Sequence, residues 1–126
     1  MNGYLLDTHV FLWWMGDQPR LREEVRFIIR APQSDIYLSI ASSWELSIKA
    51  SLGKLEVPED LPGALTANDI KPLSITLVHT MDVRTLPMIH RDPFDRLIVA
   101  QARAEGLTLV THDATLTRYD VPCLLT

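Results

Sequence analysis

The sequence predicts an α/β domain in which a parallel sheet of about five strands is covered by helices on both faces. Two observations support this fold. Short segments rich in branched and aromatic residues alternate with segments whose apolar residues have helical spacing. The chain also has 126 residues and 47% hydrophobic content, which suits one compact core and leaves no room for a second domain. We therefore expect residues 1–126 to form a single domain.

The first predicted strand is YLLD at 4–7, and it leads directly into a helix with the sequence THVFLWWMG at 8–16. A second helix is expected over 19–31, because Pro19 suits a first helical position. Its apolar residues form one stripe, which consists of Leu21, Val25, Ile28 and Ile29. The next strand is predicted at 36–39, with the sequence IYLS.

The middle of the chain begins with a helix predicted over 42–53, SSWELSIKASLG, which Gly53 is expected to end. Proline and glycine in the segment 57–65 favour a loop or a short helix. A third strand, KPLSI, is expected at 71–75. It is followed by a helix over 76–87 that stops at Pro87.

The strongest helical signal is PFDRLIVAQARAEG at 93–106, which has Pro93 at its start and Gly106 at its end. A strand is predicted at 108–111, followed by a short helix at 113–119. The closing strand, VPCLL at 121–125, contains a proline that cannot donate to a neighbouring strand. We therefore expect this last strand at an edge of the sheet.

Composition excludes several classes of protein. A single cysteine, Cys123, rules out a disulfide framework, and the longest apolar stretch at 10–15 is too short to cross a bilayer. The amino terminus lacks the basic and apolar regions of a secretory signal. We expect a soluble, cytoplasmic protein with no membrane partner. The net charge of −4 disfavours non-specific electrostatic binding of nucleic acid over a wide surface, but it does not exclude a nuclease that uses bound cations.

Four carboxylates lie where a predicted strand ends or a helix begins: Asp7, Glu45, Asp95 and Asp113. In an alternating fold such positions converge at one edge of the sheet, where open α/β proteins bind their ligands. Like charges at close range repel unless a cation neutralises them. Because the ligands are all oxygens, the sequence favours Mg²⁺ or Mn²⁺ over zinc.

Each of these acids also has a purely structural explanation. Ser42 and Glu45 have the spacing of a capping box, and Glu45 could instead pair with Lys49. Asp92 is expected to cap the helix that starts at Pro93, and Asp7 and Asp113 could be caps as well. For any one of these acids, capping is the commoner role.

The direction of the side chains favours a shared site. Asp95 borders an apolar stripe that contains Ile98, Val99 and Ala102, and Glu45 has the same relation to Ile48 and Leu52. Carboxylates at the edge of the core are poorly solvated. We therefore expect either a cation beside them or a raised pKa.

Four segments resemble, in order, the motifs of the PIN-domain ribonucleases, and within them the VapC-type toxins: YLLDTHVFLWW, SIASSWELSIKASLGKL, HRDPFDRLIVAQA and LVTHDATLTRY. The resemblance implies that Asp7, Glu45, Asp95 and Asp113 hold catalytic Mg²⁺ or Mn²⁺ for cleavage of RNA. We assign Asp7 and Asp95 to a first ion, with Glu45 and Asp113 completing that site or a second one. The resemblance also implies a homodimer and a small antitoxin partner.

The remaining polar residues have weaker signals. The four histidines, His9, His79, His90 and His112, show no zinc-binding spacing, and we expect a passive role even for His112 beside Asp113. Arg96 and Arg103 should share an outward helix face, either holding RNA phosphates or simply solvated. Thr8 and Thr111 could position water, but strand or turn chemistry is the commoner use.

Two questions stay open on the sequence alone. The tryptophans Trp13, Trp14 and Trp44 could all fill one core, or part of their surface could be covered by a partner. A phosphatase or receiver-like domain with Asp7 as phosphoryl acceptor is an alternative function, although His9 stands where the haloacid-dehalogenase pattern DxD requires aspartate. A binding module without catalysis is another alternative.

Overall fold

The computed structural model describes residues 2–126, so Met1 of the expected domain lies outside the described residues. Five strands form one sheet in the order β3-β2-β1-β4-β5, and every pairing is parallel, as predicted. The strands are β1 (Asn2–Leu6), β2 (Ser34–Ser39), β3 (Ile70–Leu73), β4 (Thr108–Thr111) and β5 (Cys123–Leu125). The prediction of an edge position for the last strand is confirmed.

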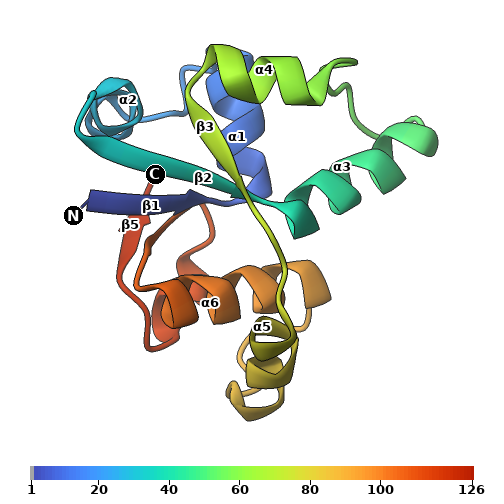
Figure 1. Cartoon of the computed structure of the whole chain (residues 1–126), viewed down its shortest axis with the longest axis vertical. Coiled ribbons are helices and arrows are strands. Elements are labelled where there is room, and N and C mark those ends of the chain that lie inside the picture. Colours follow the sequence, from blue (N-terminus) through green and yellow to red (C-terminus); the bar gives the residue numbers. More distant parts are fainter. Residues whose placement is uncertain (1) are drawn as a thin grey trace.

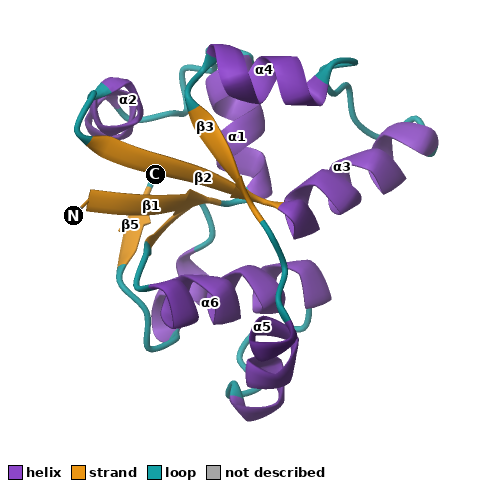
Figure 2. Cartoon of the chain, in the orientation of Figure 1, coloured by secondary structure: helices purple, strands orange, loops and turns teal. Residues whose placement is uncertain are grey.

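Helices cover both faces of the sheet (Figure 1). One face carries α1 (Thr8–Met15), α2 (Glu23–Arg30) and α4 (Leu61–Ala67), and the other carries α5 (Leu77–Asp82) and α6 (Pro93–Glu105). The helix α3 (Ile40–Ser51) projects beyond the carboxyl ends of the strands, and Figure 2 separates these helices from the strands and loops. Two 3₁₀ helices, η1 (Val83–Thr85) and η2 (Ala114–Arg118), complete the fold. Within residues 2–126, each helix is too short or too polar for a membrane crossing.

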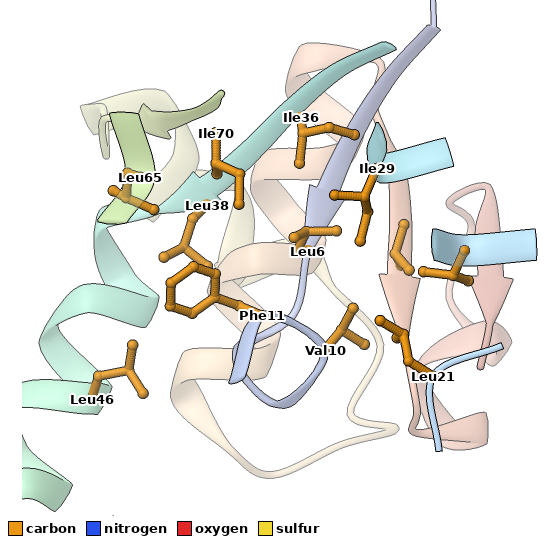
Figure 3. Packing of buried hydrophobic residues seen from close by; sticks show 12 residues of the cluster. Leu6, Val10, Phe11, Leu21, Ile29, Ile36, Leu38, Leu46, Leu65 and Ile70 are labelled. Carbon is orange, nitrogen blue, oxygen red and sulfur yellow. The ribbon is translucent and has the colours of Figure 1, made fainter. Parts of the chain in front are cut away.

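The core has two parts because successive residues of a strand point to opposite faces of the sheet. Leu6 packs with Phe11, Leu38 and other residues on the side of α1 (Figure 3). Its neighbour Leu5 packs with Val99 of α6 on the opposite side. A parallel sheet that is buried on both faces requires apolar residues in succession, which explains the unbroken run before Asp7.

Several helix boundaries differ from the prediction. The helix α2 begins at Glu23 rather than at Pro19, which lies in a preceding turn. The helix α3 begins at Ile40 because the Ser39 hydroxyl accepts a hydrogen bond from the Ala41 amide. Ser42 therefore lies inside the helix, and the expected capping box is wrong. The end of this helix agrees with the prediction, since Ser51 is its last residue, Leu52 its cap, and Gly53 follows with a positive φ of 69°.

The helices after α3 agree with the predicted boundaries to different degrees. The single helix expected over 76–87 is shorter, because the α-helix ends at Asp82 and the chain continues as η1. The segment 57–65, expected as a loop or short helix, contains the start of α4. Gly106 ends α6 as predicted, with a positive φ of 66° that favours glycine.

Two predicted side-chain directions are wrong. The residues Ile48 and Leu52 do not pack on the sheet, since 36% and 61% of their surfaces are exposed. Glu45 is buried nevertheless, because it faces α1 through Thr8. Arg96 does not share an outward face with Arg103, since only 8% of its surface is exposed. The chain from 83 to 90 folds over this part of α6, which helical periodicity alone does not reveal.

Candidate functional site

The four predicted site acids lie at the carboxyl edge of the sheet. Asp7 directly follows β1, and Asp113 lies two residues after β4, the strand that pairs with β1. Asp95 is in the first turn of α6. Glu45 is in α3, which starts where β2 ends. The topology thus brings four separated segments to the same edge of the sheet. Among the described residues, ligand atoms lie within 4.8 Å of one another in His90, Asp95 and Asp113, and neither Asp7 nor Glu45 is part of that group.

Asp7 is buried and held by several donors. Its Oδ1 accepts a hydrogen bond from the Val10 amide at 2.7 Å, so Asp7 caps α1. Its Oδ2 accepts from the Thr111 hydroxyl at 2.5 Å and from the His112 amide at 3.3 Å. The capping role and a place in the site therefore coexist in one side chain.

Glu45 is buried, and each of its carboxylate oxygens accepts a hydrogen bond from a neighbouring side chain. Thr8 Oγ1 donates to Oε1 at 2.7 Å, and Lys49 Nζ donates to Oε2 at 2.8 Å. The alternative pairing with Lys49 is therefore present. The hydrogen bond that Lys49 donates to Glu45 raises the pKa of Lys49, which keeps this amine charged.

Asp95 is the least compensated acid of the site. Among residues 2–126, the nearest basic group is His90, whose Nε2 lies 3.5 Å from Asp95 Oδ2. Burial, the charge of Asp92 and the more distant charges of Asp7 and Glu45 raise the pKa of Asp95 to about 7. The cost of ionising this group is what a bound cation would remove.

Asp113 has the opposite electrostatic character. Its Oδ1 accepts a hydrogen bond from the Thr115 amide at 2.9 Å, and His90 Nε2 lies 2.9 Å from its Oδ2. Burial alone would raise the pKa of Asp113, but these hydrogen bonds outweigh it and lower the pKa. Ligand atoms of His90, Asp95 and Asp113 all lie within 4.8 Å of one another, close enough for a shared cation.

The surroundings of the site include aromatic rings near Asp7. His112 Nδ1 lies 3.3 Å from Asp7 Oδ2, and this hydrogen bond raises the pKa of His112. Its ring lies 4.7 Å from the ring of His9 and 5.2 Å from that of Trp13. His112 is therefore in direct contact with a predicted site acid.

Sequence reasoning missed the contacts that three residues make with the site acids. His90 was grouped with the other histidines, yet it bridges two of the acids. Thr8 and Thr111 bond directly to Glu45 and Asp7. The position of Thr8 next to Asp7 was a usable signal, but the position of His90 depends on a loop whose path the sequence does not show.

The tryptophans do not fill one core. Trp13 and Trp14 pack beside the α1-side cluster, and the Trp14 indole donates to Asn68. Trp44 is 61% exposed, and its ring lies edge-on to that of Phe94 at a centroid distance of 5.2 Å. Part of the tryptophan surface is thus free for a partner.

Comparison with known proteins gives consistent results. The family model described as PIN domain matches residues 4–122. Ribonuclease VapC22 from Mycobacterium tuberculosis is 31% identical over 126 residues, with 97% of this chain and 95% of that protein covered.

Solved structures with the same fold include VapBC2 from Rickettsia felis bound to a promoter DNA fragment, with a TM-score of 0.74 and 19% identity. DNA-bound VapBC from Salmonella typhimurium has a TM-score of 0.69 and also 19% identity. Each of these two comparisons covers 98% of both chains.

Proposed function

The chain belongs to the PIN-domain family, and from this membership we propose that it is a metal-dependent endoribonuclease, the toxin of a toxin/antitoxin pair. The name of the curated relative, a VapC ribonuclease, supports the reaction. The observation that carries the proposal is that Asp113 lies within 4.8 Å of Asp95, a buried carboxylate whose pKa the charges of Asp7 and Glu45 also raise. We also propose that residues 1–126 act as one PIN domain in the cytoplasm, with which the unpaired Cys123 is consistent.

The residues of the site fit Mg²⁺ or Mn²⁺. We assign the ligands to Asp7, Glu45, Asp95 and Asp113, whose oxygens suit hard divalent cations. Asp95 supports this assignment most strongly, because burial and the charges of neighbouring acids raise its pKa to about 7, although His90 partly offsets them. When bound, a divalent ion supplies Lewis-acid activation of water and neutralises charge that develops on a phosphodiester.

The protein's own groups prepare the carboxylates for this chemistry. The Val10 amide and the Thr111 hydroxyl fix both oxygens of Asp7. Thr8 and Lys49 do the same for Glu45. Such fixed ligands need little rearrangement to bind a cation, which favours tight and specific coordination.

Membership of the PIN-domain family favours nuclease chemistry over the phosphoryl-transfer alternative. A purely structural role for the acids does not explain why Asp95 is left without a strong donor.

Substitution by asparagine tests the proposal, because asparagine retains the shape and the capping ability of aspartate but is a poorer metal ligand. We expect Asp7→Asn and Asp95→Asn to abolish cleavage of a mixed RNA pool in Mg²⁺ while both variants remain folded. The surface variant Asp120→Asn is the matched control and should cleave normally. Full activity in both site variants would reject the assignment.

We propose that the antitoxin binds the apolar concavities beside α1. One, of about 590 Å³, is lined by residues that include Trp13, Leu55 and Val57. The other, of about 680 Å³, shares Leu55 and Val57 and extends along α3. Neighbours of this fold include a toxin-antitoxin complex from Klebsiella pneumoniae.

The antitoxin assignment is tested with the product of the adjacent reading frame. We expect Leu55→Asp and Val57→Asp to prevent co-purification with it. The exposed Met88→Asp on a different loop is the control and should leave it intact. If the antitoxin still binds after both Leu55→Asp and Val57→Asp, it does not bind at these concavities.

A homodimer is the second proposed assembly. Four exposed apolar residues recur every four positions along α3 and its carboxyl-terminal cap: Ile40, Trp44, Ile48 and Leu52. An apolar stripe of this kind is typical of a protein interface. We expect Trp44→Lys to shift the protein to monomer in sedimentation equilibrium. The control Phe27→Lys, on α2, should not, and a dimer unaffected by the Trp44 change would exclude this face.

A further inference from the structure

His90 is held in one place by contacts with four residues, at the start of α6 and at the two ends of η2. Its backbone amide donates to the Tyr119 hydroxyl at 2.8 Å. The Asp92 amide donates to its Nδ1 at 3.0 Å. Its Nε2 lies 2.9 Å from Asp113 Oδ2 and 3.5 Å from Asp95 Oδ2. The imidazole is therefore directed between two of the site acids.

The buried guanidinium of Arg96 fixes the loop that carries His90. Nη1 donates to the carbonyl of Pro87 at 3.0 Å, and Nη2 donates to that of Val83 at 3.1 Å. Nη1 also lies 3.3 Å from the Tyr119 hydroxyl, which binds the His90 amide. One side chain of α6 thus anchors the segment from 83 to 90 against the helix that carries Asp95.

The hydrogen bond from Asp92 determines which nitrogen of His90 carries the proton. Because Nδ1 accepts from the Asp92 amide, its lone pair is occupied and Nε2 bears the hydrogen. A nitrogen that bears a hydrogen has no lone pair for a metal ion. Short distances between His90, Asp95 and Asp113 therefore do not make His90 a ligand.

We propose that His90 is a positioning residue, whose Nε2–H donates to Asp113 and holds this carboxylate beside Asp95 for a divalent cation that His90 does not itself bind. This inference rests on the proposed function and adds a residue to it. With Thr115 on Oδ1 and His90 on Oδ2, both oxygens of Asp113 have a fixed donor, and each retains a second lone pair.

Three substitutions of His90 separate this role from simple packing. The side-chain amide nitrogen of glutamine can replace Nε2 and reach Asp113, whereas that of asparagine corresponds to Nδ1 and falls short. Alanine removes the donor altogether. Since glutamine and asparagine differ by one methylene, their comparison stays informative even if the alanine variant folds poorly. Met88→Ala, in the same loop and exposed, is the matched control.

The readout is the affinity for Mn²⁺ alone, measured from the free-ion signal in electron paramagnetic resonance. Loss of a hydrogen bond to a metal ligand typically weakens metal binding about 10- to 100-fold. We expect this loss in His90→Ala and His90→Asn, with most of the affinity retained in His90→Gln and all of it in Met88→Ala. Thermal denaturation in EDTA shows whether each variant is folded.

Pulsed electron paramagnetic resonance of the Mn²⁺-loaded protein then tests whether His90 is a ligand. We expect no nitrogen coupling that depends on His90. A ¹⁴N modulation that disappears in His90→Ala would overturn the inference by making His90 a ligand. Unchanged Mn²⁺ affinity in His90→Ala, with lost affinity in Asp95→Asn, would overturn this inference alone. Wild-type protein that binds no Mn²⁺ would overturn the proposed function together with it.

Discussion

Replacement of Asp95 by asparagine should stabilise the metal-free protein above neutral pH, although the same change should abolish cation binding. The folded state holds the proton of Asp95 more tightly than the unfolded chain, since its pKa rises from 3.8 to about 7. The folded state therefore binds more protons between these values, and its stability falls as pH rises from about 4 to about 7. Asparagine cannot ionise, so the variant escapes this loss.

The size of the effect follows from the pKa shift. A shift of about three units corresponds to about 4 kcal/mol at about 1.4 kcal/mol per unit. The side chain keeps 26% of its exposure, so solvent screening reduces this figure, and we take about half of it. Asparagine also loses about 0.5 kcal/mol of favourable interaction with the amino-terminal dipole of α6. The variant should therefore be about 1.5 kcal/mol more stable at pH 8, or roughly 5 °C in Tm.

Urea denaturation of both proteins in EDTA, at several pH values from 4 to 8, measures this difference. The two free energies of unfolding should nearly coincide at pH 4 and diverge toward pH 8. Asp120→Asn is an exposed control that should follow the wild type throughout. Addition of Mn²⁺ at pH 8 should raise the stability of the wild type but not that of Asp95→Asn. A variant that is less stable than the wild type at pH 8 would refute the reasoning.

Arg96→Lys should lower the free energy of unfolding, measured in urea, by about 2–3 kcal/mol, because several buried carbonyls lose their donor. Arg103→Lys on the surface should change it little. Equal effects of the two substitutions would contradict a stabilising role for the hydrogen bonds of Arg96. In EDTA, NMR titration should give His112 a pKa above its usual 6.5, since Asp7 accepts its hydrogen bond. The charged pair of His112 and Asp7 stabilises the fold fully below pH 6.5, and this contribution is lost as pH rises through the raised pKa of His112. Asp7→Asn should lower the pKa of His112, and an unchanged value would show that Asp7 does not raise it. Gly106→Ala should cost about 1 kcal/mol in thermal denaturation because of its positive φ, and a neutral effect would argue against strain there.

The positions of the site acids could be predicted because they depend on local order along the chain. Asp7 follows an apolar strand and Asp95 follows a proline at a helix start, and both signals lie within a few residues. The parallel arrangement then places such positions at one edge of the sheet. What each acid contacts depends instead on side chains far away in sequence. The bond from Thr111 to Asp7 spans 104 residues, and no local pattern encodes it.

Arg96 shows why helical periodicity failed where it did. The pattern of α6 correctly buries Ile98 and Val99, because these residues face the sheet. A charged residue on the adjoining face is normally solvated, but here the segment from 83 to 90 covers it and offers carbonyl acceptors. That segment begins with the 3₁₀ helix η1 and continues as an irregular loop, and neither carries an apolar period. The same lack of a signal hid the place of His90.

The negative net charge of the protein is compatible with a polyanionic substrate only if a cation is bound at the site. A net charge of −4 and an acidic cluster would repel a phosphodiester in the absence of bound metal. A divalent ion among the carboxylates reverses the sign that a phosphate meets at that point and leaves the rest of the surface acidic. Attraction is then confined to the carboxyl edge of the sheet. Weak, salt-sensitive binding of RNA outside the site, with strong dependence on divalent ions, is the behaviour that this charge distribution requires.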